Sequence, residues 1–500
     1  MINNVLEWLE AAALQYPEKE AYLEREKSLS FAAVLQLSKR IGSALLAVEG
    51  KAPIAVISGR SVETIPAYFG CVYSGHAYAP VDGTLPERRI ERILETLHPS
   101  AILADDTYFD LAEDLAGGKM PVFLLQEAMY TEIAQARLDQ IRRAAVLTDP
   151  LYVIFTSGST GNPKGVITSH ESLICYIESY AQVMEIDETD RMGNQSPLDY
   201  IAAIRDIYLP VYKGASAVII PKEYFMEPNR LFEFLNGMGV TSVGWSVSAF
   251  TVALSLGAFE EVSLTTLKKV CFSGSVMPAS CLAVWQRELP DAKFVNQYGP
   301  TEATASCTYY VVDHLVSQDE QLPIGVPYRN YKVFLLSEDL TETPIGEIGE
   351  ICVSGPILAL GYYNDPERTQ QSFVMNPNCT GYPERMYRTG DYGRIRADGL
   401  LEFHGRMDRQ IKHMGHRVEL DEIEYAAGQI TGIRECAVLY HKSKEALYLF
   451  YAGDIDKRAL TIELRKVLPG FMVPRKVKQM EHLPKLANGK IDMNVLKEEL

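Results

Sequence analysis

The segment from Tyr152 to Val166, YVIFTSGSTGNPKGV, constrains the fold of this 500-residue chain more than any other stretch. Its first residues are apolar and predict a buried strand that ends in a loop rich in hydroxyl and glycine residues. Backbone N–H groups beside glycines can approach an anion closely, and Lys164 adds a positive charge, so the loop is typical of a phosphate site. It is not a Walker loop, because Pro163 stands where the second glycine of G-x-x-x-x-G-K-[ST] would fall.

Short apolar strands alternate with helices up to about Gly299. Strands are predicted at 53–59, 100–106, 216–221, 241–247, 267–274 and 292–299, and a helix at 86–98. This alternation predicts an α/β fold in which largely parallel sheets are covered by helices. From about Pro323 the texture changes, and glycine-separated strands at 328–336, 346–355 and 400–406 predict a smaller β subdomain.

A domain boundary is predicted near Arg406. Residues 1–405 form the large N-terminal domain in this interpretation, and residues 406–500 form a small α+β C-terminal domain. Within the small domain, helices are predicted at 419–430 and 461–471, strands at 435–442 and 446–453, and a short helix at the end of the chain. A site at the junction of two such domains is a common arrangement in enzymes.

Composition and charge exclude several classes of protein. The net charge of −17 disfavours a nucleic-acid partner. No apolar run reaches the roughly 18 residues of a membrane helix, and the N-terminus lacks the basic region of a signal peptide. The eight cysteines are scattered without a C-x-x-C pair, which argues against a zinc site or a disulfide framework. We therefore expect a cytoplasmic protein with no membrane partner.

Two further motifs carry side chains that suit a nucleotide. In the segment 296–302, NQYGPTE, Tyr298 offers an aromatic face for a purine, Thr301 a hydroxyl for phosphate, and Glu302 a hard oxygen ligand for Mg²⁺. Asp391 ends the segment YRTGD, and an aspartate at such a turn can bind ribose hydroxyls. Each motif alone is also compatible with an ordinary turn, and the weight comes from their occurrence together.

These motifs belong to an ordered set that resembles the adenylate-forming superfamily, which includes acyl-CoA synthetases, luciferases and the adenylation domains of nonribosomal peptide synthetases. The matching stretches are TSGSTGNPKG, NQYGPTEA, GEIGEICVSGPILALGYYNDPERT, YRTGDYG, GRMDRQIKHMGHRVELDEIE and LPKLANGKID. The stretches GHRVELDEIE and NGK are most similar to peptide-synthetase adenylation domains and D-alanine–carrier protein ligases. The resemblance implies that the C-terminal domain is mobile and rotates about Asp408.

The resemblance also assigns roles to individual residues. ATP would be bound by Thr156, Ser157, Gly158, Ser159, Thr160, Gly161 and Lys164 in the phosphate loop, and by Ser273, Gly274, Asn296, Tyr298, Gly299, Asp391 and Arg406. Thr301 would contact the α-phosphate, Glu302 would bind Mg²⁺, and Lys490 would bridge the substrate carboxylate and the phosphate. Since a carboxylate is already ionised at neutral pH, no general base is needed, and catalysis consists of positioning and charge stabilisation.

The acid pocket departs from the pattern of its relatives. Adenylation domains that select α-amino acids hold the amine with an aspartate, and an ungapped alignment puts Ile201 at that position. Asp199 lies two residues earlier, and Arg205 could pair with a substrate anion or with Asp199. The pocket lining implied by the resemblance is Asp199, Tyr200, Ile201, Ala202, Arg205, Trp245, Cys271, Ser273, Gln297, Ala305 and Ser306.

Three interpretations of the pocket remain open at this point. The substrate is a β-amino acid or similar compound whose amine is held by Asp199, or an aryl or hydroxy acid without that amine. In the third, the local alignment is shifted and Asp199 plays the usual role. The sequence does not identify the acid.

The leading functional hypothesis is an enzyme that activates a small carboxylic or amino acid with ATP and Mg²⁺. It would then load the acid onto the phosphopantetheine thiol of a separate acyl or peptidyl carrier protein. The alternative within the superfamily is an acyl- or aryl-CoA ligase. A catalytically silent nucleotide-binding module is the alternative from another class. The presence of Lys164, Glu302, Asp391 and Lys490 argues against it.

Overall fold

The computed structural model describes residues 2–158, 162–485 and 491–500. The chain divides into two compact units. Unit 1 comprises Met1–Gly83, Leu97–Ile154 and Gly165–Met407, and unit 2 comprises Thr84–Thr96, Phe155–Lys164 and Asp408–Leu500. The division after Met407 falls close to the sequence-based boundary at residue 405. Two short segments that the sequence assigned to the large domain group instead with unit 2.

A nine-stranded sheet forms one layer of unit 1. Its strands are β1 (Glu20–Leu23), β2 (Ser28–Ser30), β9 (Arg191–Asn194), β10 (Ser216–Ile219), β11 (Ser242–Ser246), β12 (Lys269–Ser273), β13 (Lys293–Tyr298), β14 (Thr308–Val312) and β15 (Val326–Pro327). They follow the order β15-β14-β13-β12-β11-β9-β10-β1-β2. The six central strands β13, β12, β11, β9, β10 and β1 pair with one another in parallel. At the two edges, β2 and the strands β14 and β15 pair antiparallel.

A seven-stranded sheet forms a second layer. It contains β3 (Ile54–Ser58), β4 (Tyr78–Asp82), β5 (Ala101–Ala104), β6 (Val122–Leu124), β7 (Pro150–Thr156), β8 (Lys164–Ser169) and β18 (Gly361–Tyr362). The order is β18-β8-β7-β4-β3-β5-β6. The predicted strand before the phosphate loop is β7, so the loop joins two strands of this sheet.

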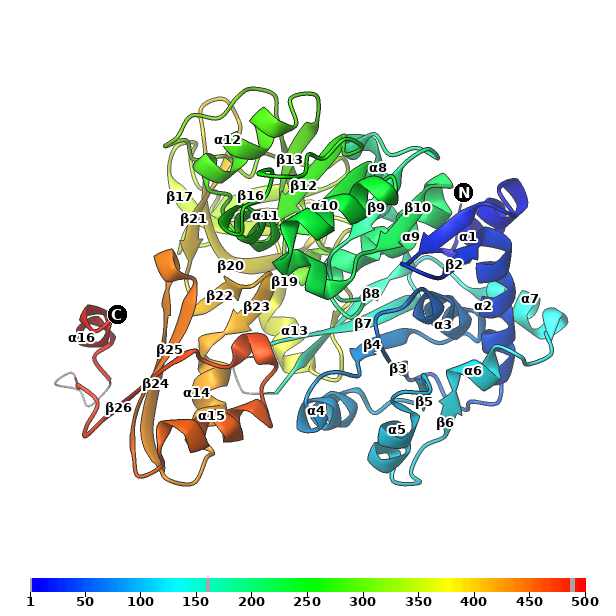
Figure 1. Ribbon diagram of the computed structural model, residues 1–500, viewed down its shortest axis with the longest axis horizontal. Coiled ribbons are helices and arrows are strands. Elements are labelled where there is room, and N and C mark those ends of the chain that lie inside the picture. Colours follow the sequence, from blue (N-terminus) through cyan, green and yellow to red (C-terminus); the bar gives the residue numbers. More distant parts are fainter. Residues whose placement is uncertain (1, 159–161, 486–490) are drawn as a thin grey trace. The chain divides into compact units, whose positions relative to one another are not determined.

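The helices of unit 1 cover these sheets (Figure 1). They are α1 (Leu6–Gln15), α2 (Phe31–Leu45), α3 (Ile65–Tyr73), α5 (Phe109–Ala116), α6 (Leu125–Ala128), α7 (Gln135–Ala144), α8 (His170–Met184), α9 (Ile204–Lys213), α10 (Pro228–Gly237), α11 (Val247–Ser255), α12 (Ala279–Glu288) and α13 (Pro366–Ser372). Ser169 caps the start of α8, where its hydroxyl accepts a hydrogen bond from the Ser172 amide. Gly214, in the left-handed conformation, caps the end of α9.

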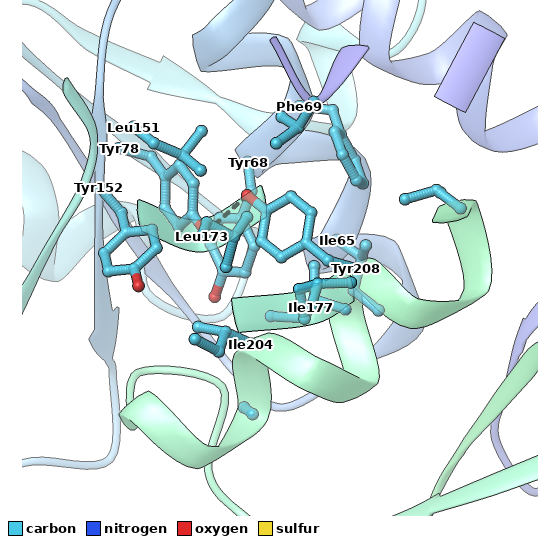
Figure 2. Close-up of a cluster of buried hydrophobic side chains, with 14 of the residues drawn as sticks. Ile65, Tyr68, Phe69, Tyr78, Leu151, Tyr152, Leu173, Ile177, Ile204 and Tyr208 are labelled. Atoms are coloured by element: carbon cyan, nitrogen blue, oxygen red, sulfur yellow. Dashed lines mark hydrogen bonds between the residues drawn. The ribbon is translucent and has the colours of Figure 1, made fainter. Parts of the chain in front are cut away.

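Helices α8 and α9 connect the two sheets through one apolar cluster. Figure 2 shows part of it, with Leu173 and Ile177 of α8 and Ile204 and Tyr208 of α9 beside side chains of β4 and β7. The Tyr78 and Tyr208 hydroxyls lie 2.9 Å apart. Burial of this cluster therefore fixes the position of both helices, which also carry polar side chains discussed below. On the opposite face of the nine-stranded sheet, α10, α11 and α12 pack in a second apolar cluster.

The predicted β subdomain is a five-stranded sheet. It contains β16 (Lys332–Leu336), β17 (Ile348–Ser354), β19 (Phe373–Met375), β20 (Arg385–Ile395) and β21 (Leu401–Arg406). The order is β16-β17-β20-β19, and β21 pairs with β20.

Unit 2 is built around a three-stranded sheet of β24 (Ile433–His441), β25 (Ala446–Gly453) and β26 (Lys476–Met480). A hairpin of β22 (Gln410–His413) and β23 (His416–Glu419) leads into α14 (Leu420–Gly428). The remaining helices are α4 (Glu87–Leu97), which ends at the border with unit 1, α15 (Lys457–Arg465) and α16 (Met493–Glu498). The helix predicted at 461–471 begins four residues earlier, because the Asp456 side chain caps its amides, and it ends before Pro469.

The fold class predicted from the sequence is confirmed. Helix-covered, largely parallel sheets, a small β subdomain and a C-terminal α+β region are all present. Among the described residues, no helix is both long and apolar enough to cross a membrane.

Candidate functional site

Three residues that the sequence assigned to the nucleotide meet in unit 1. The Tyr298 hydroxyl at the end of β13 donates a 2.5 Å hydrogen bond to Oδ2 of Asp391 on β20. Arg406 on β21 donates to Oδ1 of the same carboxylate and forms an ion pair with it. Strand register explains the second contact, since Asp391 and Arg406 are paired residues of β20 and β21. Burial, followed by the Asp391 charge, raises the pKa of Tyr298.

Glu302 follows β13 in a short 3₁₀ turn, Thr301–Ala303. Its side chain is fully buried, and Oε1 accepts a 2.7 Å hydrogen bond from the Tyr362 hydroxyl. The turn depends on Gly299, because a Cβ there would lie 2.5 Å from the Ser306 Cα. One oriented carboxylate is a ligand set that fits Mg²⁺, which proteins commonly hold by one or two carboxylates plus substrate phosphates. The described residues contain no cluster of three or more potential metal ligands.

Ser273, Gly274 and Asn296 lie on the neighbouring strand ends. Ser273 closes β12 directly beside Gln297 of β13. Gly274 has φ of +101°, which a side chain would strain. The Asn296 amide donates to the Pro323 carbonyl at 2.9 Å, so this side chain supports the loop after β14.

The described part of the phosphate loop belongs to unit 2. The Ser157 hydroxyl donates to the Arg417 carbonyl at 2.8 Å, and Lys164 lies near Glu419, where its charge opposes the raised pKa of that carboxyl. The Thr156 hydroxyl is buried without a hydrogen-bond partner among the described residues. Ser159, Thr160, Gly161 and Lys490, also predicted to bind ATP or catalyse, lie outside the described residues.

One backbone amide of this loop is hydrogen-bonded to a carboxylate. The Gly158 N–H donates to Oε2 of Glu422 on α14 at 3.2 Å, and Arg89 on α4 pairs with the other oxygen. Glu422 is almost fully buried, and burial raises its pKa against the opposing effect of Arg89. The Gly158 amide of the loop therefore already donates to an anionic side chain of the same chain. Arg89 and Glu422 were not predicted from the sequence, although Glu422 lies in the stretch GHRVELDEIE.

Asp408 begins the C-terminal segment of unit 2, and its carboxylate accepts a hydrogen bond from the Gln410 amide at 3.2 Å. It lies at the division between the units, next to the sequence-based boundary. Its role as a hinge stays a prediction.

Several predicted pocket residues share one face of the nine-stranded sheet. Register places Gly244, Cys271 and Val295 in one row across β11, β12 and β13, and Ser246, Ser273 and Gln297 in the next row on the same face. Gln297 donates to the Tyr328 hydroxyl at 2.6 Å and accepts from Ser306 at 3.3 Å. Ala305 precedes Ser306 with φ of +74°.

Helices α8 and α9 complete this region. Arg205 of α9 is only 2% exposed, and its guanidinium donates to the Gly244 carbonyl. The ring of Tyr180 on α8 lies 5.7 Å from the Arg205 Cζ. Tyr176, Tyr180 and Tyr328 were not predicted from the sequence. The spacing of Tyr176 and Tyr180 on one helix face was the signal that could have found the first two.

Trp245 does not belong to this region. Successive side chains of a strand point to opposite faces, and the Trp245 ring lies in the cluster formed with α10, α11 and α12. Its Nε1 donates to the Gly193 carbonyl at 2.9 Å. The assignment of Trp245 to the pocket is therefore wrong in this structure, and Gly244 takes its place.

The predicted pocket residues in the segment before α9 lie in different surroundings. Ile201 is 6% exposed and belongs to the apolar cluster shared by the two sheets, and Tyr200 packs against that cluster. Ala202, between them and α9, is half-buried. Burial raises the pKa of Asp199 to about 7, and the neighbouring Asp82 charge adds to the effect. Within the described residues Arg205 makes no ion pair, so the suggested Arg205–Asp199 pair is not formed.

Comparison with known proteins agrees with this arrangement. Residues 9–363 match the family of AMP-binding enzymes. The chain is 30% identical to a plipastatin synthase component of Bacillus subtilis over 99% of its own length. It is 31% identical to a linear gramicidin synthase component of Brevibacillus parabrevis over 97%. It spans only 14% and 9% of those two proteins.

A relative of similar length is D-alanine–D-alanyl carrier protein ligase of Bacillus cereus, which is 29% identical over 99% of both chains. Among solved structures, the adenylation domain AlmE of Vibrio cholerae in complex with glycyl-adenosine-5'-phosphate matches all of this chain and 98% of its own. The TM-score is 0.85 at 23% identity, a likeness of fold. The chain belongs to the family of AMP-binding enzymes. This agrees with the superfamily that the sequence motifs resemble.

Proposed function

We propose that this protein activates a small carboxylic or amino acid with ATP as an acyl-adenylate. The acyl group then passes to the phosphopantetheine thiol of a carrier protein. The observation that carries the first half is the convergence of Tyr298 and Arg406, from two strands, onto the carboxylate of Asp391 on a third strand. In this proposal the Tyr298 ring stacks on adenine, and Asp391, oriented from both sides, binds the ribose hydroxyls.

The phosphate loop supports the same proposal. The Gly158 amide already binds the carboxylate of Glu422, and Lys164 provides a cation near Glu419. A triphosphate offers several anionic oxygens to such amides. Thr301, at the start of the turn after β13, would contact the α-phosphate.

The proposed reaction needs no general acid or base from the protein. An oxygen of the substrate carboxylate attacks the α-phosphorus, the bond to the bridging oxygen breaks, and pyrophosphate leaves. Lys490 would bring the two anions together. Mg²⁺ held by Glu302 would neutralise phosphate charge when bound.

The names of the relatives support a carrier protein as acceptor. One relative is a D-alanyl carrier protein ligase. A solved structure that this chain matches with TM-score 0.81 at 25% identity is holo-PA1221, a peptide-synthetase protein with adenylation and carrier domains. CoA is the competing acceptor, since an o-succinylbenzoate CoA synthetase matches the fold with TM-score 0.83.

ATP–pyrophosphate exchange across a panel of α-amino, β-amino, aryl and short-chain acids tests the first step. We expect exchange with one class of acid and its loss in Lys490→Ala. Transfer to a phosphopantetheine-bearing carrier protein, compared with transfer to free CoA, identifies the acceptor. Nucleotide binding without exchange for any acid would sink the proposal in favour of a silent module.

A further inference from the structure

Arg205 is a buried cation that makes no ion pair in the described part of the chain, although the charge of the adjacent Asp206 acts on it. It is 2% exposed, and its guanidinium donates one hydrogen bond among the described residues, to the Gly244 carbonyl. Its Nε has no hydrogen-bond partner among the described residues. Guanidinium has five N–H donors and stays charged in proteins, so most of its bonding capacity is unused. A buried charge normally requires a partner, because its desolvation is costly.

The groups around the guanidinium are neutral or already committed. Burial raises the pKa of Tyr176 to about 12 and that of Cys271 to about 11, so both are uncharged near neutral pH. The adjacent Asp206 accepts a 2.8 Å hydrogen bond from Asn194 and lies near Arg60, which also binds Asn194. Burial raises the pKa of Asp206, although the charge of Arg205 opposes this.

A second buried donor beside Arg205 also lacks a partner. The Tyr176 hydroxyl lies next to Arg205 and Ser306 but makes no hydrogen bond of good geometry with any described residue. The Arg205 Nε and the Tyr176 hydroxyl lie near each other, and neither makes a hydrogen bond of good geometry within the described residues, so they describe a site for an anion that those residues do not supply.

The sheet is shaped to seat the guanidinium. A Cβ on Gly244 would lie 2.6 Å from the Arg205 Nε and 2.7 Å from Cζ, so any side chain at this position would displace the group. Gly244 lies in the same row as Cys271, on the face that also carries Ser273 and Gln297. Arg205 is therefore held against the face that the sequence identified as the acid pocket.

We propose that Arg205 binds a second anionic group of the substrate and that the protein selects a dicarboxylic acid. One carboxylate becomes the acyl-adenylate and the other pairs with the guanidinium, with the Tyr176 hydroxyl as an additional donor. This inference rests on the proposed acid-activating function. It also accounts for Ile201, which removes the partner of an α-amine and leaves an apolar wall there.

Matched pairs of acids test the proposal: succinic against succinamic acid and glutaric against glutaramic acid, which differ only in the charge of the distal group. In ATP–pyrophosphate exchange, we expect kcat/KM of the wild type to favour the diacid by about 30-fold or more. Arg205→Leu should abolish or reverse this preference. Arg205→Lys, which keeps the charge without the planar fork, should retain part of it.

Gly244→Ala provides a variant that keeps Arg205 and alters its seat. We expect KM for the diacid to rise about tenfold while KM for the monoamide changes little, because only the anion depends on the guanidinium position. Arg230→Leu is the matched control, since Arg230 lies half-exposed on α10 in an ion pair with Glu227. It should leave the preference unchanged.

Calorimetric binding of the diacids separates this inference from the proposed function. If the wild type shows no exchange, the proposed function fails, and loss of diacid binding in Arg205→Leu still supports the anion site. A wild type that exchanges monoamides as well as diacids, or diacid binding unaffected in all three variants, overturns the inference. If Arg205→Leu does not fold, the other two variants decide. A preference for the diacid that is unchanged in both Arg205→Lys and Gly244→Ala also overturns the inference.

Discussion

Asp391 and Arg205 represent opposite solutions to placing a charge inside this protein. Asp391 is satisfied from two directions, by the Tyr298 hydroxyl and by Arg406. Arg205 is also buried, but among the described residues it has one backbone acceptor and no carboxylate in an ion pair with it. In the proposed function, the preassembled Asp391 cluster binds the nucleotide. The incomplete Arg205 site would be completed by the distal carboxylate of the acid and would thereby select it.

The largest expected effect comes from breaking the satisfied cluster. Asp391→Ala removes the carboxylate that Arg406 and Tyr298 share, and we expect a loss of about 3 kcal/mol in the free energy of unfolding. Pyrophosphate exchange should fall by about 100-fold, because the ribose loses its ligand. Denaturant unfolding and exchange measure the two effects, and Asp391→Asn controls for the loss of volume. Wild-type stability in Asp391→Ala would show that the cluster is not cohesive.

Removing the charged side chain of Arg205 should have the opposite effect on the free energy of unfolding. Arg205→Leu removes an unpaired buried charge, so the free energy of unfolding without ligand should stay unchanged or rise by up to about 2 kcal/mol. Arg406→Leu, which removes a paired arginine, should lower it by about 2 kcal/mol. Comparing both variants by denaturant unfolding sharpens the contrast. Equal destabilisation would show that Arg205 has a counter-ion in the free protein.

The carboxyl of Asp199 gives a pH test in the same region. Its pKa in the folded protein is about 7, above the ordinary value of about 4, because of burial and the Asp82 charge. A raised folded-state pKa contributes stability that is present below pH ~4 and is lost as pH rises through ~7. Asp199→Asn should flatten the stability profile across this window by up to about 1.4 kcal/mol per pH unit. Unfolding curves at several pH values check this, and an unchanged slope contradicts it.

The smallest expected effect is at Trp245, on the face away from the pocket. Trp245→Phe removes the hydrogen bond to the Gly193 carbonyl and some apolar contact, and should cost about 1 kcal/mol in stability. The ratio of exchange rates for diacid and monoamide should not change. A shifted ratio would return Trp245 to the pocket and weaken the assignment of Gly244.

The sequence predicted the layered fold well because continuous apolar strands and helices are local patterns. It placed Tyr298, Asp391 and Arg406 on separate motifs, and the structure brings them together. The error at Trp245 has a simple cause. Strand side chains alternate with a period of two, so an alignment shifted by one residue selects the wrong face.

Other features could not be read from local patterns. The pair of Arg89 with Glu422 joins residues more than 300 positions apart, and neither stands out in its own segment. The unsatisfied state of Arg205 depends on which partners are absent around it, and that is a property of the packed interior. Arg205 was predicted from the sequence to line the pocket. Its predicted partner was either a substrate anion or Asp199.

The hydrogen bond from the Gly158 amide to Glu422 has a consequence for nucleotide affinity. An N–H group that already donates to a carboxylate is not empty, so a phosphate oxygen that uses it must displace Glu422. The measured dissociation constant then reports an exchange of one anion for another, and the free energy of the Gly158–Glu422 hydrogen bond is subtracted from the intrinsic affinity for phosphate. If phosphate binds there, the Glu422 carboxylate stays tethered at the site and competes for the Gly158 amide when the nucleotide leaves.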